Sequence, residues 1–189
     1  MGLTLLTAPA VEPLSLAEAK AHCRVDSTDD DTLLTALIVT ARRMAEQVTG
    51  RVLVTQSWRY SLDAFPCAAL WLPYPPLVSV QSVKYLDGDG TLQTLVTDTD
   101  YTVHTSALLG LVVPAYGKTW PVPRIVPEAV RIEFTAGYGA AAAVPNDIKQ
   151  WLLLQIGHWY DSRSAVGDDR REPLPFVDGL LSPYIANRF

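Results

Sequence analysis

The chain has 189 residues, of which 49% are hydrophobic and 19% charged, a balance that is typical of globular proteins and excludes disorder along its whole length. Its 15 basic and 20 acidic residues give a net charge of −5, so affinity based on neutralising nucleic-acid phosphates is not expected. The two cysteines, Cys23 and Cys67, are too few for a disulfide framework and lack metal-ligand spacing, which predicts free thiols.

The N-terminal part carries the signals of two helices. Ser15 and Glu18 have capping-box spacing, which predicts a short helix that runs to about Arg24. Apolar residues then recur at helical spacing over 33–48, and Gly50 is typical of a helix end. The residues expected on the opposite side of this second helix are Arg42, Arg43 and Glu46.

The middle of the chain is predicted to form strands. From Val52 the hydrophobic period changes from 3.6 to 2, as a half-buried strand requires. The motif Asp87-Gly88-Asp89-Gly90 predicts a hairpin turn. Because no helix separates the expected strands, the sheet is predicted to be mainly antiparallel. These strands are expected at about 57–63, 70–72, 78–86, 91–96, 101–104, 108–113 and 129–135.

The C-terminal part is predicted to return to helix. A third helix is expected after Pro145, with Trp151 and Trp159 on its apolar face, followed by a charged break and a short helix at about 176–181. The predicted fold class is therefore α+β, a helical body of three to four helices with an inserted, mainly antiparallel β-module. The expected domains are residues 1–51 and 144–189 for the helical body with its C-terminal tail, and residues 52–143 for the β-rich module.

Two glycine motifs suggest ligands, but their contexts favour turns. Gly137-Tyr138-Gly139 follows a predicted strand, yet the helix starts several residues later and no parallel strand follows, which argues against a dinucleotide site. The turn at 87–90 lacks two EF-hand ligands, because Tyr85 and Val96 occupy the first and twelfth positions of the loop. No cofactor is expected.

A catalytic or metal-binding constellation is not predicted either. His22, His104 and His158 lie on three different elements, without the i,i+4 pair of a helical metal site. Nucleophile elbows, phosphate loops and spaced cysteine pairs are absent from the sequence. No enzyme activity, catalytic residue, cofactor-binding residue or metal ligand is therefore assigned. A convergence of three carboxylates stays open, those of Asp63, Glu128 and Glu133, with surface charge as the favoured interpretation.

Aromatic residues beside prolines mark candidate protein interfaces. Trp71 and Tyr74 precede or interrupt a run of prolines, and Trp120 begins a second proline-rich stretch. Aromatics in stiff segments make contact surfaces of low conformational entropy. An equally supported alternative is a rigid loop that packs on its own sheet.

Several segments together resemble the head-tail connector (adaptor) family of long-tailed bacteriophages. The resemblance extends over most of the chain. Its segments are Ser15 to Lys20, Asp31, Glu46 to Arg51, Leu72 to Leu77, Val83 to Asp87, Phe134 to Gly139, Val144 to Lys149, Trp159-Tyr160 and Leu180 to Tyr184.

The resemblance implies a virion structural protein in the phage neck. Members of this family form rings of identical subunits, commonly twelve, which bind beneath the portal protein, receive the stopper or tail-completion protein and let DNA pass through the centre. A ring forms when two different patches on each subunit meet head to tail and the rotation closes. The implied place of assembly is the cytoplasm of a bacterial host, and DNA is expected to pass without specific binding.

The C-terminal tail is the candidate for docking on the portal, because a short apolar segment after a charged break cannot bury itself fully in a core. The residues proposed for this contact are Leu180, Leu181, Tyr184, Ile185, Arg188 and Phe189. Two alternatives from other classes are a phage-encoded hydrolase and a carbohydrate- or cell-surface-binding module that uses the β-insert.

Overall fold

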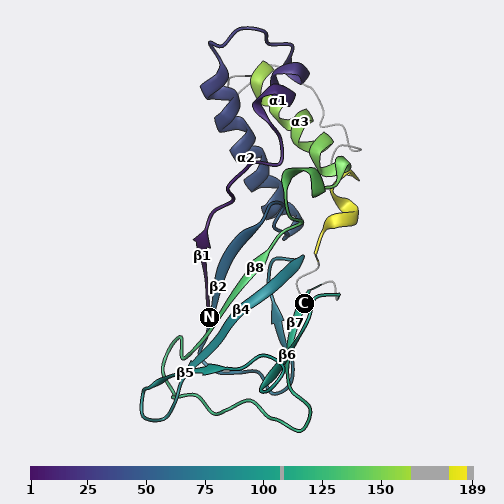
Figure 1. Cartoon of the computed structure of the whole chain (residues 1–189). Helices are drawn as coiled ribbons and strands as arrows, with labels where there is room; N and C mark the ends of the chain where they lie inside the picture. Colours follow the sequence, from purple (N-terminus) through teal and green to yellow (C-terminus); the bar gives the residue numbers. More distant parts are fainter. Residues whose placement is uncertain (107–108, 163–178, 187–189) are drawn as a thin grey trace. The chain divides into compact units, whose positions relative to one another are not determined.

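The computed structural model describes residues 1–106, 109–162 and 179–186, which form two compact units. The sheet unit consists of the described residues of Met1–Pro9 and Thr55–Tyr138, and the helical unit consists of those of Ala10–Val54 and Gly139–Phe189. Figure 1 shows that the sheet unit contains the strands β1 to β8, whereas α1, α2 and α3 belong to the helical unit. The predicted α+β class, with helices and antiparallel sheets in separate parts of the chain, is confirmed.

The helical unit begins with the predicted capping box. Helix α1 spans Leu16–Cys23; the Glu18 backbone N–H donates to the Ser15 hydroxyl (3.2 Å), and the Ser15 backbone N–H donates to the Glu18 carboxylate (2.7 Å). The hydrogen bonds that the Ser15 backbone N–H and hydroxyl donate to the carboxylate lower the pKa of Glu18. The helix ends at Arg24, whose left-handed backbone lets its N–H bond back to the last turn.

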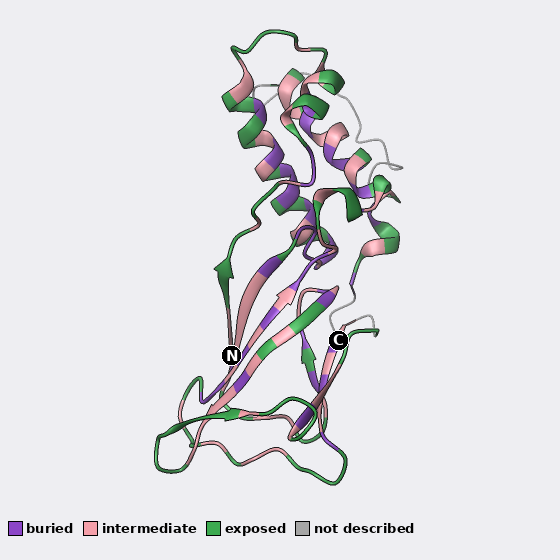
Figure 2. Ribbon diagram, viewed as in Figure 1, coloured by how far each residue is buried: buried purple, intermediate pink, exposed green. Residues whose placement is uncertain are grey.

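The core of the helical unit lies between α2 (Asp31–Thr49) and α3 (Asn146–Asp161). Buried apolar residues follow one side of each helix, which Figure 2 shows as repeated purple segments. A side chain at Gly157 of α3 would lie 3.1 Å from the His22 imidazole, so this glycine lets α1 pack close to α3. The buried residues are Leu34, Ile38, Ala41 and Ala45 on α2 and Ile148, Trp151, Leu152 and Ile156 on α3.

The sheet unit holds two antiparallel sheets with the strand orders β1-β2-β8-β4-β5 and β3-β7-β6. The central strand β8 alternates fully buried Ile132 and Phe134 with partly exposed Arg131 and Glu133, so one face of the larger sheet forms the core. The strands are β1 (Gly2–Thr7), β2 (Gln56–Leu62), β3 (Leu70–Leu72), β4 (Leu77–Leu86), β5 (Leu92–Leu95), β6 (Tyr101–His104), β7 (Gly110–Pro114) and β8 (Val130–Ala136).

The hairpin turn predicted between β4 and β5 is confirmed, and it uses the Asp87 carboxylate. This carboxylate accepts the backbone N–H groups of Asp89 (3.1 Å) and Thr91 (2.9 Å) and the side-chain amide of Gln93 (2.8 Å). Gly90 supplies the positive φ of 87° that the turn requires. The carboxylate that suggested calcium binding thus stabilises the turn.

The N-terminal residues differ from the expectation. Residues 1–9, expected in the helical body, form β1 at the edge of the larger sheet, paired with β2. Four of the six residues of β1 are exposed, so its sequence carries no burial pattern from which a strand could be predicted. Of the short helix expected at 176–181, residues 176–178 lie outside the described part, and a single 3₁₀ turn follows at Ser182–Tyr184.

Gly110 is predicted to be required where the two sheets of this unit meet. A Cβ atom at this β7 position would lie 2.7 Å from the Leu77 Cβ on β4, which is too close for any side chain. We expect Gly110→Ala to lower the free energy of unfolding by about 1–3 kcal/mol, the usual effect of overpacking. Gly88→Ala is the matched control, because a Cβ there meets nothing within 4 Å. Denaturant unfolding checks both variants, and equal stabilities would contradict the packing argument.

Candidate interaction surfaces

Two of the three carboxylates considered for a catalytic group, those of Asp63 and Glu133, are engaged in structural contacts. Asp63 accepts the backbone N–H of Glu128 (2.9 Å), whereas Glu133 accepts the Arg59 guanidinium (2.6 Å) across the β2–β8 pair. The hydrogen bond from Arg59 lowers the pKa of Glu133 against the opposing effect of burial. A general acid needs a raised pKa, so Glu133 is tuned in the opposite direction.

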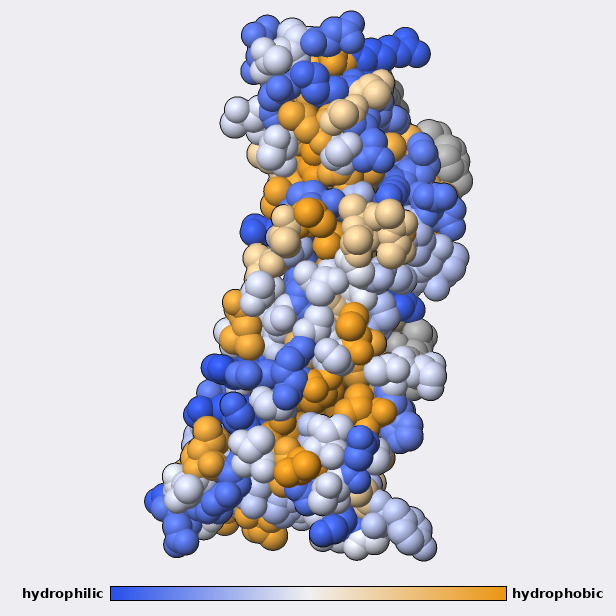
Figure 3. Space-filling view, in the orientation of Figure 1, coloured by the Kyte–Doolittle hydropathy of each residue, from blue (hydrophilic) through white to orange (hydrophobic). Residues whose placement is uncertain are grey.

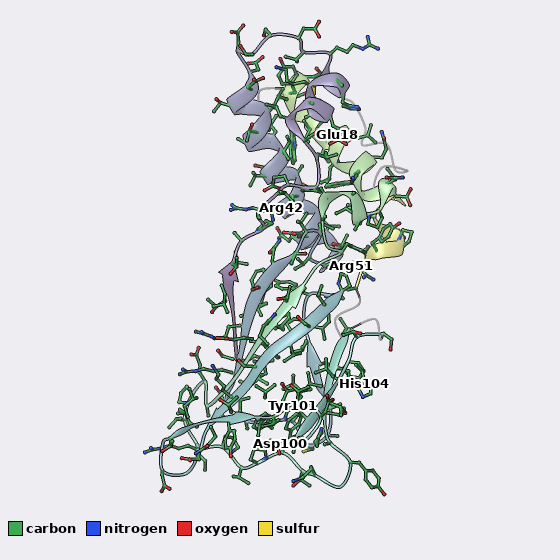
Figure 4. All side chains as sticks on the ribbon, in the orientation of Figure 1. Glu18, Arg42, Arg51, Asp100, Tyr101 and His104 are labelled. Atoms are coloured by element: carbon green, nitrogen blue, oxygen red, sulfur yellow. The ribbon has the colours of Figure 1, made fainter. Side chains whose placement is uncertain are left out.

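The cysteine and histidine side chains do not assemble a reactive site. Burial and the nearby Asp161 carboxylate raise the pKa of Cys23, which disfavours the nucleophilic thiolate. All three histidines are exposed: His22 lies beside Gly157 of α3, His104 lies at the end of β6 (Figure 4), and His158 lies on α3. Among residues 1–106, 109–162 and 179–186, no three His, Cys, Asp or Glu side chains gather as a metal ion would require.

The glycines at 137 and 139 form a turn. Gly137 and Gly139 have positive φ angles of 125° and 118°, and the Gly137 N–H donates to the Pro76 carbonyl (2.9 Å). Helix α3 begins only at Asn146, so its N-terminus is separated from the glycines.

Of the helices that the structure describes, none has the length and hydrophobicity needed to cross a membrane.

The three aromatic interface candidates occupy different environments in the sheet unit. Trp71 on β3 is 52% exposed and offers an apolar surface. Tyr74 packs on the Trp58 ring, with centroids 4.8 Å apart. Trp120 stacks on Phe65 at 4.7 Å with nearly parallel planes, and its indole N–H donates to the Ala68 carbonyl (2.9 Å). Trp71 is therefore available to a partner, whereas Tyr74 and Trp120 also hold their own segments in place.

The segment 115–128, which we call the anchored loop, presents apolar residues that the sequence analysis did not select. Besides the Trp120 contacts, the Arg124 N–H donates to the Leu86 carbonyl (2.8 Å). Three apolar side chains of the loop are almost completely exposed, those of Tyr116 at 106%, Val122 at 86% and Ile125 at 99%. A preorganised apolar loop is favourable for binding because little conformational entropy is lost. The sequence could have indicated this loop, because its apolar residues stand between prolines, and prolines cannot join the hydrogen-bond ladder of a sheet.

The visible face of the molecule carries several apolar areas of this kind. In Figure 3 they appear as orange areas between polar residues on both units. Scattered exposed apolar residues are normal for soluble proteins, whereas contiguous groups mark protein contacts. The exposed apolar residues of the anchored loop lie close together in the sequence, and the contacts of the loop to the sheet fix it in position.

The C-terminal segment is fixed to the end of α2. The Ala186 N–H donates to the Thr49 carbonyl (2.7 Å), and the Arg51 guanidinium, labelled in Figure 4, donates to the Tyr184 carbonyl. Leu181 is 1% exposed and belongs to the core, while Ile185 is 46% exposed. Leu180 and Tyr184 are partly exposed, whereas the other two predicted docking residues, Arg188 and Phe189, lie outside the described part.

A buried ion cluster, formed by Arg42, Glu12 and Glu46, holds the helical unit together. Arg42, labelled in Figure 4, donates to Glu12 (2.7 Å) and to Glu46 (2.8 Å), and Glu46 also accepts the Leu53 N–H (3.1 Å). Burial lowers the pKa of Arg42, but the hydrogen bonds and charges of the two carboxylates outweigh it and raise that pKa. The expectation that Arg42 lies opposite the apolar face is wrong, because Glu12 neutralises it inside the unit.

The likeness to solved structures covers the whole fold. The chain matches one in the virion of a native gene transfer agent particle with a TM-score of 0.82 and 24% identity, over 100% of this chain and 97% of that one. The neck of the empty particle, computed with C6 symmetry, gives the same values. The neck of the native particle, computed with C12 symmetry, gives a TM-score of 0.80 at 23% identity with the same coverage. No curated protein matches the sequence significantly.

The chain therefore has the α+β fold of chains found in these particles. Residues 13–72 match the family model of phage gp6-like head-tail connector proteins. This segment contains α1, α2 and the first strands of the sheet unit after β1. Over residues 13–72, the resemblance to head-tail connectors inferred from the sequence is confirmed.

The ion cluster is predicted to dominate the stability of the helical unit. Arg42→Met leaves the Glu12 and Glu46 carboxylates without their cation, and we expect a loss of about 2–3 kcal/mol, reduced because both keep some solvent contact. Arg43→Met at the exposed neighbouring position should change the unfolding free energy by less than about 0.5 kcal/mol. Adding Glu12→Gln to Arg42→Met should recover part of the loss. Urea unfolding measures all three, and equal effects of both arginine variants would refute the role of the cluster.

Proposed function

We propose that this chain is a structural head-tail connector (adaptor) subunit of a phage or phage-like particle. The observation that carries the proposal is the likeness of the full-length fold to chains in the neck of such a particle. The family match at residues 13–72 supports it independently, because it rests on sequence. In this role the protein joins the head to the stopper or tail and works by shape, without an enzymatic step.

The proposed assembly is a closed ring beneath the portal, with twelve subunits. The similar necks were computed with sixfold and twelvefold symmetry, and a ring of twelve copies is compatible with both. Each subunit must then carry two different patches, because a ring requires head-to-tail contacts that close by rotation. Virion assembly would take place in the cytoplasm of the bacterial host.

The charge of the chain is compatible with a DNA passage that does not retain DNA. With 20 acidic and 15 basic residues, the subunit repels phosphates on average. Several of the basic side chains are already paired with carboxylates, as Lys20 is with Asp31 and Arg59 is with Glu133. DNA would therefore move through the central channel of the ring without specific binding.

The portal contact is proposed for the C-terminal segment. Ile185, at 46%, has the most exposed large hydrophobic side chain in the described part of this segment, and its backbone neighbours are held by Thr49 and Arg51. Leu180 and Tyr184, with Arg188 and Phe189 beyond the described part, complete the proposed docking set. Leu181 is buried, so its part is to anchor the segment.

The stopper or tail-completion protein is proposed to contact the sheet unit. Trp71 and the anchored loop offer rigid apolar surfaces there, supported by Tyr74 and Trp120. A hydrolase or a carbohydrate-binding module is less favoured. The described carboxylates Asp63 and Glu133 are engaged in structural hydrogen bonds.

The position of the protein in the particle tests the proposal directly. We expect the chain with a C-terminal tag to purify with DNA-filled particles and to appear, by cryo-electron microscopy, as a ring between head and tail. Particles assembled without the chain should keep the portal but lack the tail. A chain that is absent from purified particles, or located in the tail fibres, would contradict the proposal.

The portal contact gives a separate prediction. Ile185→Glu puts a charge in the proposed interface, and we expect at least a tenfold drop in the number of copies retained on tail-less, portal-bearing heads, because an unpaired charge must then be desolvated. Val78→Glu, on an exposed β4 position of similar accessibility, should leave retention unchanged. Quantitative mass spectrometry of purified heads measures both, and full retention after removal of residues 184–189 would sink the docking proposal.

A further inference from the structure

Helix α2 has a second apolar side, which the described residues of the helical unit leave partly exposed. Its first side packs against the rest of the unit, with Leu34 and Ile38 almost fully buried. On the second side Leu33, Met44 and Val48 are 38%, 41% and 46% exposed, and Figure 2 shows exposed residues along α2 in green. Their spacing, together with partly exposed Leu37, is i, i+4, i+11 and i+15, which places all four on one line along the helix.

This line of Leu33, Leu37, Met44 and Val48, which we call the α2 stripe, also lacks charge. The residues between them on the same side are Ala36, Thr40 and Gln47. At 1.5 Å per residue the stripe is about 22 Å long. The solvent side of a surface helix normally carries charged residues, so an uncharged, half-exposed side of this length is typical of a protein contact.

The composition of the stripe excludes some occupants. DNA would need lysine or arginine at the contact, and a membrane surface would need basic residues beside the apolar ones. On the α2 stripe there is no cation, and the nearest basic residue of the helix on that side is Arg43 at its border. An apolar protein surface is the chemistry that matches.

We propose that the α2 stripe packs against the helical unit of a second copy of this chain in the assembled ring. The inference rests on the proposed function, and the symmetric necks that share this fold support a second copy as the occupant. The stripe also borders the buried side of α2 at Ala41, next to Leu37, so a neighbouring helix would extend the packing that already exists inside the unit.

The contact is heterologous, because a ring joins the stripe of each copy to a different surface of the next. Cross-links that start from the stripe must therefore continue from copy to copy. A two-fold contact of stripe against stripe would stop at two chains. This difference separates a ring contact from a simple dimer.

Photo-cross-linking tests the proposal in assembled particles. With p-benzoylphenylalanine in place of Met44, irradiation should give a ladder of adducts that contain only this chain and extend beyond two copies. The matched control has the same residue in place of Thr35, an exposed position on the other side of α2 that bonds within its own helix. The control should give at least fivefold fewer adducts between copies.

A second arm uses charge. Met44→Glu combined with Val48→Glu should reduce ring formation at least tenfold, while Thr35→Glu should not, and matching unfolding midpoints show that all variants are folded. Met44 adducts to another virion protein, adducts that end at two chains, or no adducts between copies in intact necks would overturn the inference while the neck function stands. A ladder formed by a chain that is absent from the neck would refute the function and keep the contact.

Discussion

The helical unit depends on the neutralisation of one buried cation. Arg42 is surrounded by protein, and its charge is tolerated only because Glu12 and Glu46 approach it from two segments of the chain. Glu46 also receives the Leu53 N–H, so the same cluster fixes the segment that leaves α2. The end of α2 is thereby positioned for the contacts of Thr49 and Arg51 with the C-terminal segment.

In the sheet unit, contacts between aromatic rings fix the loops in position. Stacking of Trp120 on Phe65 fixes a segment whose prolines prevent it from joining a ladder. Tyr74 is held on Trp58 in the same way. The outcome is a set of exposed apolar residues on rigid supports. A protein that functions by contact benefits from this arrangement, because its surfaces are ordered before a partner arrives.

Local signals explain what could be predicted from the sequence. The capping box at Ser15, the helix end at Gly50 and the turn at Asp87 each depend on a few neighbouring residues, and all three are present. The burial of Arg42 could not be predicted, because its partner Glu12 is 30 residues away. Strand β1 was missed since an exposed edge strand shows no alternation. The exposed apolar side of α2 that includes Met44 could not be predicted, because the apolar periodicity indicates a helix but not whether one or two of its sides are apolar.

The attachment of the C-terminal segment has a mechanical consequence. Ile185 lies between two anchored backbone groups, the Tyr184 carbonyl held by Arg51 and the Ala186 N–H held by Thr49. A pull on the Ile185 side chain would load both bonds together, one at Thr49, the last residue of α2, and one at Arg51, two residues further on.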